Sequence, residues 1–185
     1  MWQGFVVEDG GTMIVINSTV IKDAQNAVFV MPDGKLDISE ATLDRNYIGI
    51  NIPHLNNGLI NVTGTTFSCT GCLTGISLKQ SSTGYLGNVT RAGMIINDGF
   101  YSIGNAQSGT NTFKELYRGI ESHSSICKIA NTTFENFPSQ NEYIELPTDP
   151  GGGIAIYASN TPTGTMSITG LGIGTASPVI FTNCF

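Results

Sequence analysis

The residues of this chain that could do chemistry are two histidines and a small number of acidic and basic side chains. Glu121 and His123 stand two positions apart, and residues two apart on a β-strand point to the same side of the sheet. Lys79 falls in the preceding unit of the repeat described below. We therefore predict that Glu121, His123 and Lys79 form one outward polar patch able to bind a ligand. Because outward polar residues on strands are mostly a solvated surface, the pattern assigns no catalytic residue.

The cysteines allow three interpretations. Cys69 and Cys72 have C-x-x-C spacing, and together with His123 and Cys127 they could supply four zinc ligands. A Cys69–Cys72 disulfide would instead require an oxidising compartment. The third interpretation is free thiols at or near the core, because Cys127 takes a position that is apolar in other units and buried cysteine acts as a small hydrophobe. The third is preferred, so no metal and no cofactor is predicted.

Glycan cleavage would require carboxylates, either as an acid/base pair or as calcium ligands. Asp23, Asp44 and Glu115 all follow a repeated dipeptide, but at three, one and two residues from it. They are therefore not expected to form one in-line cluster. A calcium-dependent lyase would also need an arginine beside such a cluster. The arginines of the chain are Arg45, Arg91 and Arg118.

The composition excludes several classes of protein. Charged residues make up only 12% of the 185 residues, whereas glycine occurs 23 times and the net charge is −6. The low charge and the supply of Ile, Val and Phe argue against disorder, and Gly, Thr and Asn are poor helix formers. The net negative charge argues against nucleic acid as a partner. No apolar run approaches the roughly 20 residues of a membrane span.

An internal repeat must position these side chains. A dipeptide of Thr and a large apolar residue recurs along the chain. In most copies, further apolar residues stand seven and five positions before the apolar member of the dipeptide. The dipeptides are Thr19-Val20, Thr42-Leu43, Thr66-Phe67, Thr112-Phe113 and Thr133-Phe134, with Ile180-Phe181 as a looser copy. The preceding pairs are Met13/Val15, Leu36/Ile38, Ile60/Val62 and Cys127/Ile129.

Small residues complete the frame, each followed by an alternating apolar run. They are Gly4, Ala27, Gly49, Gly75, Gly119 and Gly153. Alternation indicates strands with one buried face, and three short strands in a unit of this length cannot bury that face alone. Parallel stacking of successive units can bury it, with Gly, Asn and Asp expected at the corners because they tolerate left-handed backbone geometry.

We therefore predict an all-β, right-handed parallel β-helix over residues 1–185, with about six to seven coils of three short strands. Long insertions are expected near 81–93 and 138–152, which are rich in turn residues. A β-sandwich or jelly roll would also use many short strands. Such a fold would not be expected to repeat the same spacing of small and apolar residues along the chain.

Two stretches carry a resemblance to a known family, Asn111–Ile120 and Asn131–Phe137. Their pattern resembles right-handed parallel β-helix proteins of the pectate-lyase-like superfamily, and in particular repeats in large secreted surface proteins of Bacteroidetes-type bacteria. The resemblance implies an extracellular or cell-surface location and export by a type IX system, whose C-terminal sorting domain is not found in this segment. It also implies that polysaccharide would lie on the strand face that carries Glu121 and His123. Repeat motifs specify fold better than function.

The function expected from the sequence is a structural or ligand-binding solenoid segment of a secreted or cell-surface protein. The expected partner is a polysaccharide or another surface protein. The alternative is part of a polysaccharide lyase or glycoside hydrolase, and a third hypothesis, ice binding, rests on the single file of Thr. The segment shows no signal peptide and ends within an apolar pattern. These ends predict a piece excised from a longer chain and end-to-end self-association through uncapped strand edges.

Overall fold

The computed structural model describes residues 1–54, 58–71, 89–105, 109–137, 153–159, 166–168, 179–182 and 184. Every regular element within these residues is a β-strand, as the alternating pattern predicts. The strands are β1 (Phe5–Val7), β2 (Thr12–Val15), β3 (Val20–Lys22), β4 (Asn26–Val30), β5 (Lys35–Ser39), β6 (Thr42–Asp44), β7 (Ile48–Ile52), β8 (Leu59–Thr63), β9 (Thr66–Ser68), β10 (Ala92–Ile103), β11 (Asn111–Lys114), β12 (Arg118–Ile129), β13 (Thr132–Glu135), β14 (Ile154–Ser159), β15 (Met166–Ile168) and β16 (Val179–Thr182).

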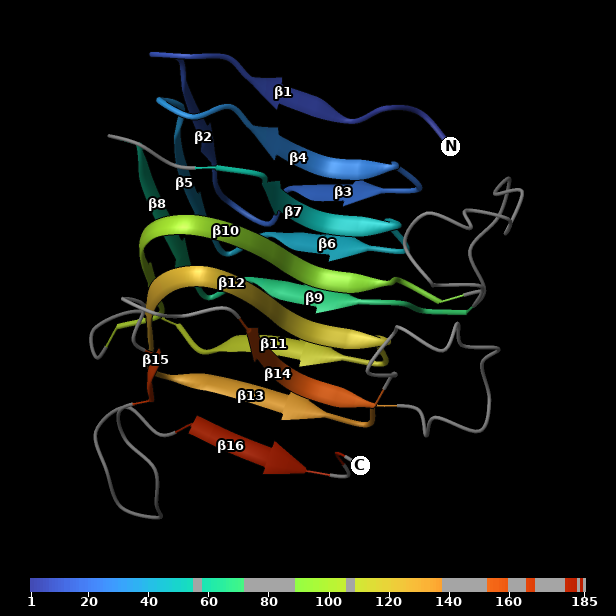
Figure 1. Cartoon of the computed structure of the whole chain (residues 1–185). Coiled ribbons are helices and arrows are strands. Elements are labelled where there is room, and N and C mark those ends of the chain that lie inside the picture. The colour runs from blue at the N-terminus through green and yellow to red at the C-terminus, as the bar shows by residue number, and fades with distance from the viewer. Residues whose placement is uncertain are drawn as a thin grey trace.

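The strands form two parallel sheets. A 10-stranded sheet contains the run β1-β4-β7-β10-β8-β5-β2, with β12, β14 and β15 continuing from β10, and a 6-stranded sheet has the order β16-β13-β11-β9-β6-β3. Strands that pair with each other in one sheet are separated along the chain by a strand of the other sheet, and equivalent strands stack above one another (Figure 1). This all-β arrangement of parallel strands is consistent with a parallel β-solenoid.

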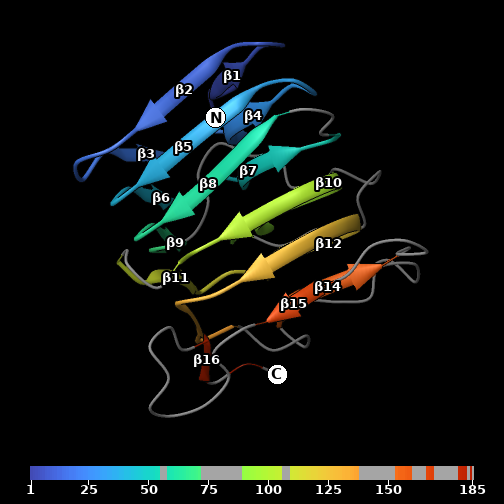
Figure 2. The same ribbon diagram turned by 90° about the vertical axis from the view of Figure 1, so that its left-hand side faces the viewer.

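The two longest strands bend in the middle. The first part of β10 pairs with β7 and its last residues pair with β8, and β12 divides in the same way between β14 and β15. Asp98 and Ser124, which face each other across the pair, have positive φ angles of 46° and 50°. The bend turns each strand from one side of the stack to the next (Figure 2). In each of β10 and β12, two of the short strands predicted for a unit are therefore joined into one continuous strand.

The repeated dipeptide is in register in the 6-stranded sheet. The Thr residues at 42, 66, 112 and 133 stand side by side, and the next residue in each unit points into the core. Phe67, Phe113, Phe134 and Phe181 stack with ring centroids 4.4–5.1 Å apart. The first copy is shifted, because Val20 rather than Thr19 pairs with Thr42. Ile180 takes the Thr position at the other end, as the looser copy predicts.

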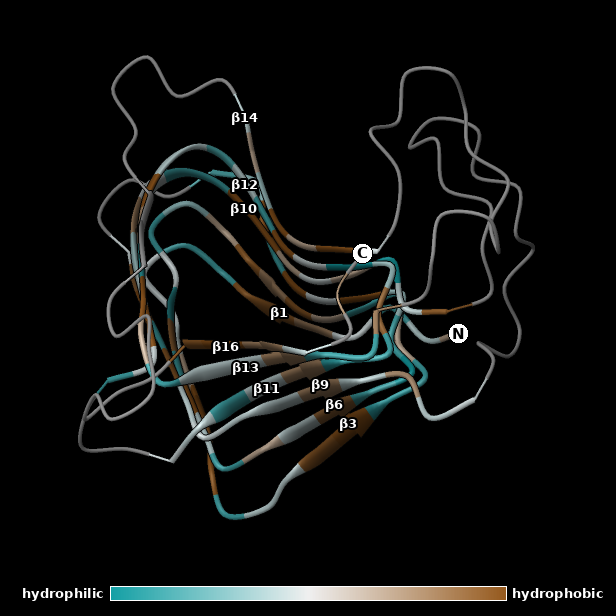
Figure 3. Cartoon of the chain, turned by 90° about the horizontal axis from the view of Figure 1, so that it is seen from below, coloured by the Kyte–Doolittle hydropathy of each residue, from teal (hydrophilic) through white to brown (hydrophobic). Residues whose placement is uncertain are grey.

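The small residues are explained by the phenylalanine stack. A Cβ added to Gly93 would lie 2.6 Å from Cδ1 of Phe113, and one added to Gly49 would lie 2.9 Å from Cδ1 of Phe67. A Cβ on Gly49 would also lie 2.3 Å from the carbonyl oxygen of Gly93. The rings and the neighbouring backbone together therefore leave no room for a side chain at these positions. Figure 3 looks along the stack, and the apolar interior that results lies between the two sheets.

Two members of the predicted small-residue frame need correction. The register of β12 and β14 pairs Ile120 with Ile156, so Ala155 and not Gly153 is equivalent to Gly119. Strand β10 pairs directly with β7, so Gly93 follows Gly49 in the column. Gly75 lies outside the described residues. The predicted insertion 81–93 ends in strand, since Ala92 opens β10, and 138–152 lies outside the described residues.

Left-handed backbone geometry flanks the strands of the 6-stranded sheet at fixed positions. The residue two positions before Val20, Thr42, Thr66 and Thr133 has positive φ, and so does the residue three positions after Val20, Thr42, Thr112 and Thr133. The first group is Ser18, Glu40, Gly64 and Asn131, and the second is Asp23, Arg45, Glu115 and Asn136. The prediction that Gly, Asn and Asp alone occupy these corners is therefore wrong, because Ser, Glu and Arg also take them.

The described residues contain no helix long and apolar enough to cross a membrane.

Candidate functional site: a buried charge cluster on the outer face of β12

Glu121 and His123 lie on the outer side of the first part of β12. Their neighbours along the strand point inward, since Ile120 is 0% and Ser122 is 1% exposed. In register, Glu121 stands between Ile95 of β10 and Tyr157 of β14. The neighbouring strand therefore places Ile95 beside Glu121. The predicted third member of the patch, Lys79, lies outside the described residues.

The carboxylate of Glu121 is buried between two arginines. Only 6% of its side chain is exposed, and the side chains of Arg91 and Arg118 are 8% and 2% exposed. Nη1 of Arg91 lies 2.8 Å and Nη1 of Arg118 lies 3.2 Å from Oε2, and Nη2 of Arg91 donates a hydrogen bond of 3.1 Å to Oε1. Buried charges need such partners, because an isolated ion in a protein interior is very costly. Glu121 is therefore the centre of a charge cluster rather than a solvated side chain.

His123 connects this cluster to the surface. Its Nε2 lies 3.1 Å from Oε1 of Glu121, and its Nδ1 lies 2.6 Å from Oγ of Ser159 on β14. The His123 side chain is 29% exposed. The contact with Ser159 follows directly from the register, since the two residues are paired across β12 and β14. The three side chains thus form a hydrogen-bonded chain from the buried carboxylate to a hydroxyl on the outer strand.

The surroundings hold Glu121 in its charged form. Burial alone would raise the pKa of the Glu121 carboxyl, but the hydrogen bond from His123 and the charges of Arg91 and Arg118 outweigh burial and lower the pKa to about 2. A carboxylate with this pKa does not serve as a general acid near neutral pH. The chemical role open to Glu121 is to accept hydrogen bonds and orient His123.

Tyr157 forms the side of the cluster nearest the end of the stack. The guanidinium carbon of Arg118 lies 5.1 Å from the centre of the Tyr157 ring, and the His123 ring meets the same ring edge-on with 5.9 Å between centroids. A cation over an aromatic face contributes about 0.5–2 kcal/mol, depending on desolvation. Tyr157 therefore fixes Arg118 and His123 and presents an aromatic surface beside them.

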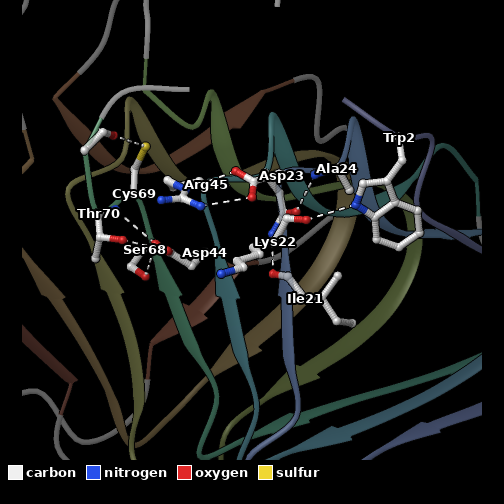
Figure 4. Close-up of polar contacts among 12 residues, drawn as sticks. Trp2, Ile21, Lys22, Asp23, Ala24, Asp44, Arg45, Ser68, Cys69 and Thr70 are labelled. Atoms are coloured by element: carbon white, nitrogen blue, oxygen red, sulfur yellow. Dashed lines mark hydrogen bonds and ion pairs between the residues drawn. The ribbon is translucent and has the colours of Figure 1, made fainter. Parts of the chain in front are cut away.

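Asp23 and Asp44, two of the acidic residues that follow the dipeptide, lie at a corner far along the chain from this cluster (Figure 4). Arg45 binds Asp23 through two hydrogen bonds of 3.0 and 2.9 Å. Asp44 accepts hydrogen bonds from Ser68 and from both the amide and the hydroxyl of Thr70. Burial opposes ionisation of Asp44, but the bonds from Thr70 and Ser68 lower its pKa below the ordinary value. This corner is held together internally and leaves no pair of carboxylates for acid/base chemistry.

The cysteines are consistent with the core interpretation where the structure describes them. Cys127 is fully buried beside Tyr101, and burial raises the pKa of its thiol to about 12. Because Cys127 points inward and His123 outward on the same strand, the two cannot bind one zinc ion. Cys69 is buried, and Cys72 lies outside the described residues. Among the described residues no group of three His, Cys, Asp or Glu side chains could hold a metal ion.

Comparisons with protein-family models, with curated proteins and with solved structures found no match to this chain. The site must therefore be interpreted from its own geometry.

Three members of the cluster were not found from the sequence. Arg91 and Arg118 were considered only as partners of a calcium site, and Ser159 was not considered. Ser159 could have been found, because with Ala155 in place of Gly153 the repeat frame puts it beside His123. Arg91 carries no comparable signal, since its place depends on how the chain returns to β10 after a long connection.

Proposed function

We propose that this chain is a ligand-binding solenoid segment, and that it binds polysaccharide on the outer face of β10, β12 and β14. The observation that most supports polysaccharide binding is the cluster around Glu121. Its carboxylate is buried between two arginines, and the cluster holds His123 and Tyr157 at the surface. Aromatic rings beside fixed polar groups suit a sugar, whose faces are partly apolar and whose hydroxyls need hydrogen-bond partners. The coils are proposed to be right-handed and about six to seven in number, with the insertions contributing to the contact surface.

The charge of the cluster favours a ligand with acidic groups. Two arginines stand against one carboxylate, so the cluster has a net charge of about +1 with His123 neutral. The whole chain is acidic, with a net charge of −6, so this cluster differs in sign from the rest of the molecule. A secreted or cell-surface location, in a protein of the pectate-lyase-like kind exported by a type IX system, belongs to the same proposal.

The alternative of a lyase or hydrolase that uses paired carboxylates gains no specific support from the described residues. Glu121 is bound by two arginines, and Asp44 and Asp23 are used at another corner. Binding is therefore the function to test first.

The test is a binding measurement with a panel of neutral and acidic polysaccharides, by calorimetry and by retention in affinity gels. Tyr157→Ala should weaken binding at least tenfold, because it removes the aromatic surface. The matched control is Lys128→Ala, an exposed residue on the far side of the bend in β12. If no polysaccharide binds, or if both variants bind polysaccharide as tightly as the unmodified chain does, polysaccharide binding on this face is excluded.

A further inference from the structure

The proton positions in the chain Glu121–His123–Ser159 follow from the hydrogen bonds. The Glu121 carboxylate lies against two arginines and can only accept hydrogen bonds. Nε2 of His123, 3.1 Å from Oε1, must therefore carry a proton and donate it. In the neutral imidazole Nδ1 then has a free lone pair. Since Nδ1 lies 2.6 Å from Oγ of Ser159, the serine hydroxyl donates its hydrogen to this nitrogen.

This arrangement has the elements of an activated nucleophile. A serine becomes nucleophilic when its hydroxyl is hydrogen-bonded to a base and a third group orients that base. The support is rigid, since β12 and β14 are neighbouring parallel strands and the His123 ring is fixed between Glu121 and Tyr157. Ser159 and His123 are both partly exposed, so a reactant can reach them.

Other serines on the same strands differ in their partners. Ser125 is buried and donates to the carbonyl oxygens of His123 and Ile96. Ser102 is exposed on β10 at a position paired with Lys128. Ser159, in contrast to Ser125 and Ser102, has its hydroxyl 2.6 Å from an imidazole nitrogen. A chemical distinction between Ser159 and Ser102 would therefore report on His123 rather than on exposure.

We propose that Ser159 is a nucleophile that accepts an acyl group from esters of small carboxylic acids, with His123 as its general base and Glu121 as a positioning residue. Oγ attacks the ester carbonyl carbon while its proton passes to Nδ1 of His123. The ester C–O bond then breaks, and the departing alcohol takes that proton. Water attacks the acyl-serine through the same base, which releases the acid and restores Ser159.

Esters rather than amides are the class of substrate this site fits. An alkoxide or phenolate leaves more readily than an amine and demands less of the base. This activity goes beyond binding and does not depend on polysaccharide recognition.

The first experiment uses a fluorophosphonate, on which Oγ displaces fluoride at phosphorus. We expect one adduct on the full chain, located at Ser159 by peptide mass spectrometry. Ser159→Ala should abolish the adduct and Ser102→Ala, the matched control, should leave its rate unchanged. His123→Ala should slow labelling about 100-fold, the size of a general-base contribution, and added imidazole should restore part of the rate.

The second experiment uses 4-nitrophenyl acetate, which should release one nitrophenolate per chain in a burst that Ser159→Ala lacks. Circular dichroism of each variant establishes that it is folded before its rate is compared. Absence of an adduct at Ser159 in the folded chain would overturn the proposal, as would equal labelling of the His123→Ala variant. Either result leaves polysaccharide binding untouched, and a failure to bind polysaccharide leaves the labelling result standing.

Discussion

Nη1 of Arg91 lies 2.8 Å from Oε2 of Glu121, and both side chains are more than nine-tenths buried. Arg91 precedes β10 and Glu121 lies within β12, so the pair joins two neighbouring strands on their outer side. Arg118 closes the other side of the carboxylate at 3.2 Å. The outer face of these strands is thus held by a charge cluster with water largely excluded, in a region where a solenoid would normally present solvated side chains.

Removing the carboxylate should destabilise the chain strongly. Glu121→Ala would leave two buried guanidinium groups without their counter-ion, and breaking a buried ion pair from one side costs about 3–5 kcal/mol. The measurement is the free energy of unfolding from urea titration. The control is Glu8→Gln, which alters a carboxylate in an exposed turn and should change the free energy by no more than about 0.5 kcal/mol. Equal effects of the two changes would contradict the buried cluster.

The contribution of Glu121 should also depend on pH. Its pKa is about 2 in the folded chain against 4.5 in an ordinary glutamate. A depressed folded pKa gives stability that is fully present above pH 4.5 and is lost as the pH falls toward 2. The difference in unfolding free energy between the unmodified chain and Glu121→Gln should therefore shrink over that interval. Parallel stability curves from pH 6 to pH 2 would show that Glu121 has no depressed pKa.

The sequence was sufficient to predict the strand frame in the 6-stranded sheet, for a physical reason. Residues stacked in one inward column must all be apolar, so Leu43, Phe67 and Phe113 reveal the column by their type. The error at the last unit has an equally physical cause. Gly153 and Ala155 are both small and both precede an isoleucine, so only the backbone pairing distinguishes them.

The candidate site could be predicted only in part. Alternation alone places Glu121 and His123 on one side of their strand, and the structure agrees. Alternation does not indicate that Glu121 is buried, because its burial depends on Arg118 of the same strand and on Arg91, which precedes the neighbouring strand β10. Arg91 lies 30 residues before Glu121, and it is the pairing of β10 with β12 that brings the two side chains together.

The column of small residues should tolerate no added methyl group opposite phenylalanine. Gly93→Ala would place Cβ 2.6 Å from Cδ1 of Phe113, and forcing the ring aside should cost about 1–3 kcal/mol. The chain itself offers a comparison, because Ala27 takes the position equivalent to Gly93 in a unit whose inward residue is Leu43 and not phenylalanine. In a Phe113→Leu background the cost of Gly93→Ala should be smaller by at least about 0.5 kcal/mol. Additive effects in that double-mutant cycle would contradict the proposed contact.

The Thr70 hydroxyl should contribute measurably to the stability of the corner around Asp44. Thr70 donates to Oδ2 of Asp44 from its hydroxyl at 2.6 Å and to Oδ1 from its amide at 2.9 Å. Thr70→Ala removes the first bond and keeps the second, so the unfolding free energy should fall by about 1 kcal/mol, since a hydrogen bond to a charged group is involved but Thr70 is exposed. The pKa of Asp44 should also rise toward its ordinary value, which an NMR titration of the carboxyl carbon measures. Thr70→Ser retains the hydroxyl and should preserve both properties. If Thr70→Ser behaves like Thr70→Ala, the threonine methyl and not the hydrogen bond stabilises this corner.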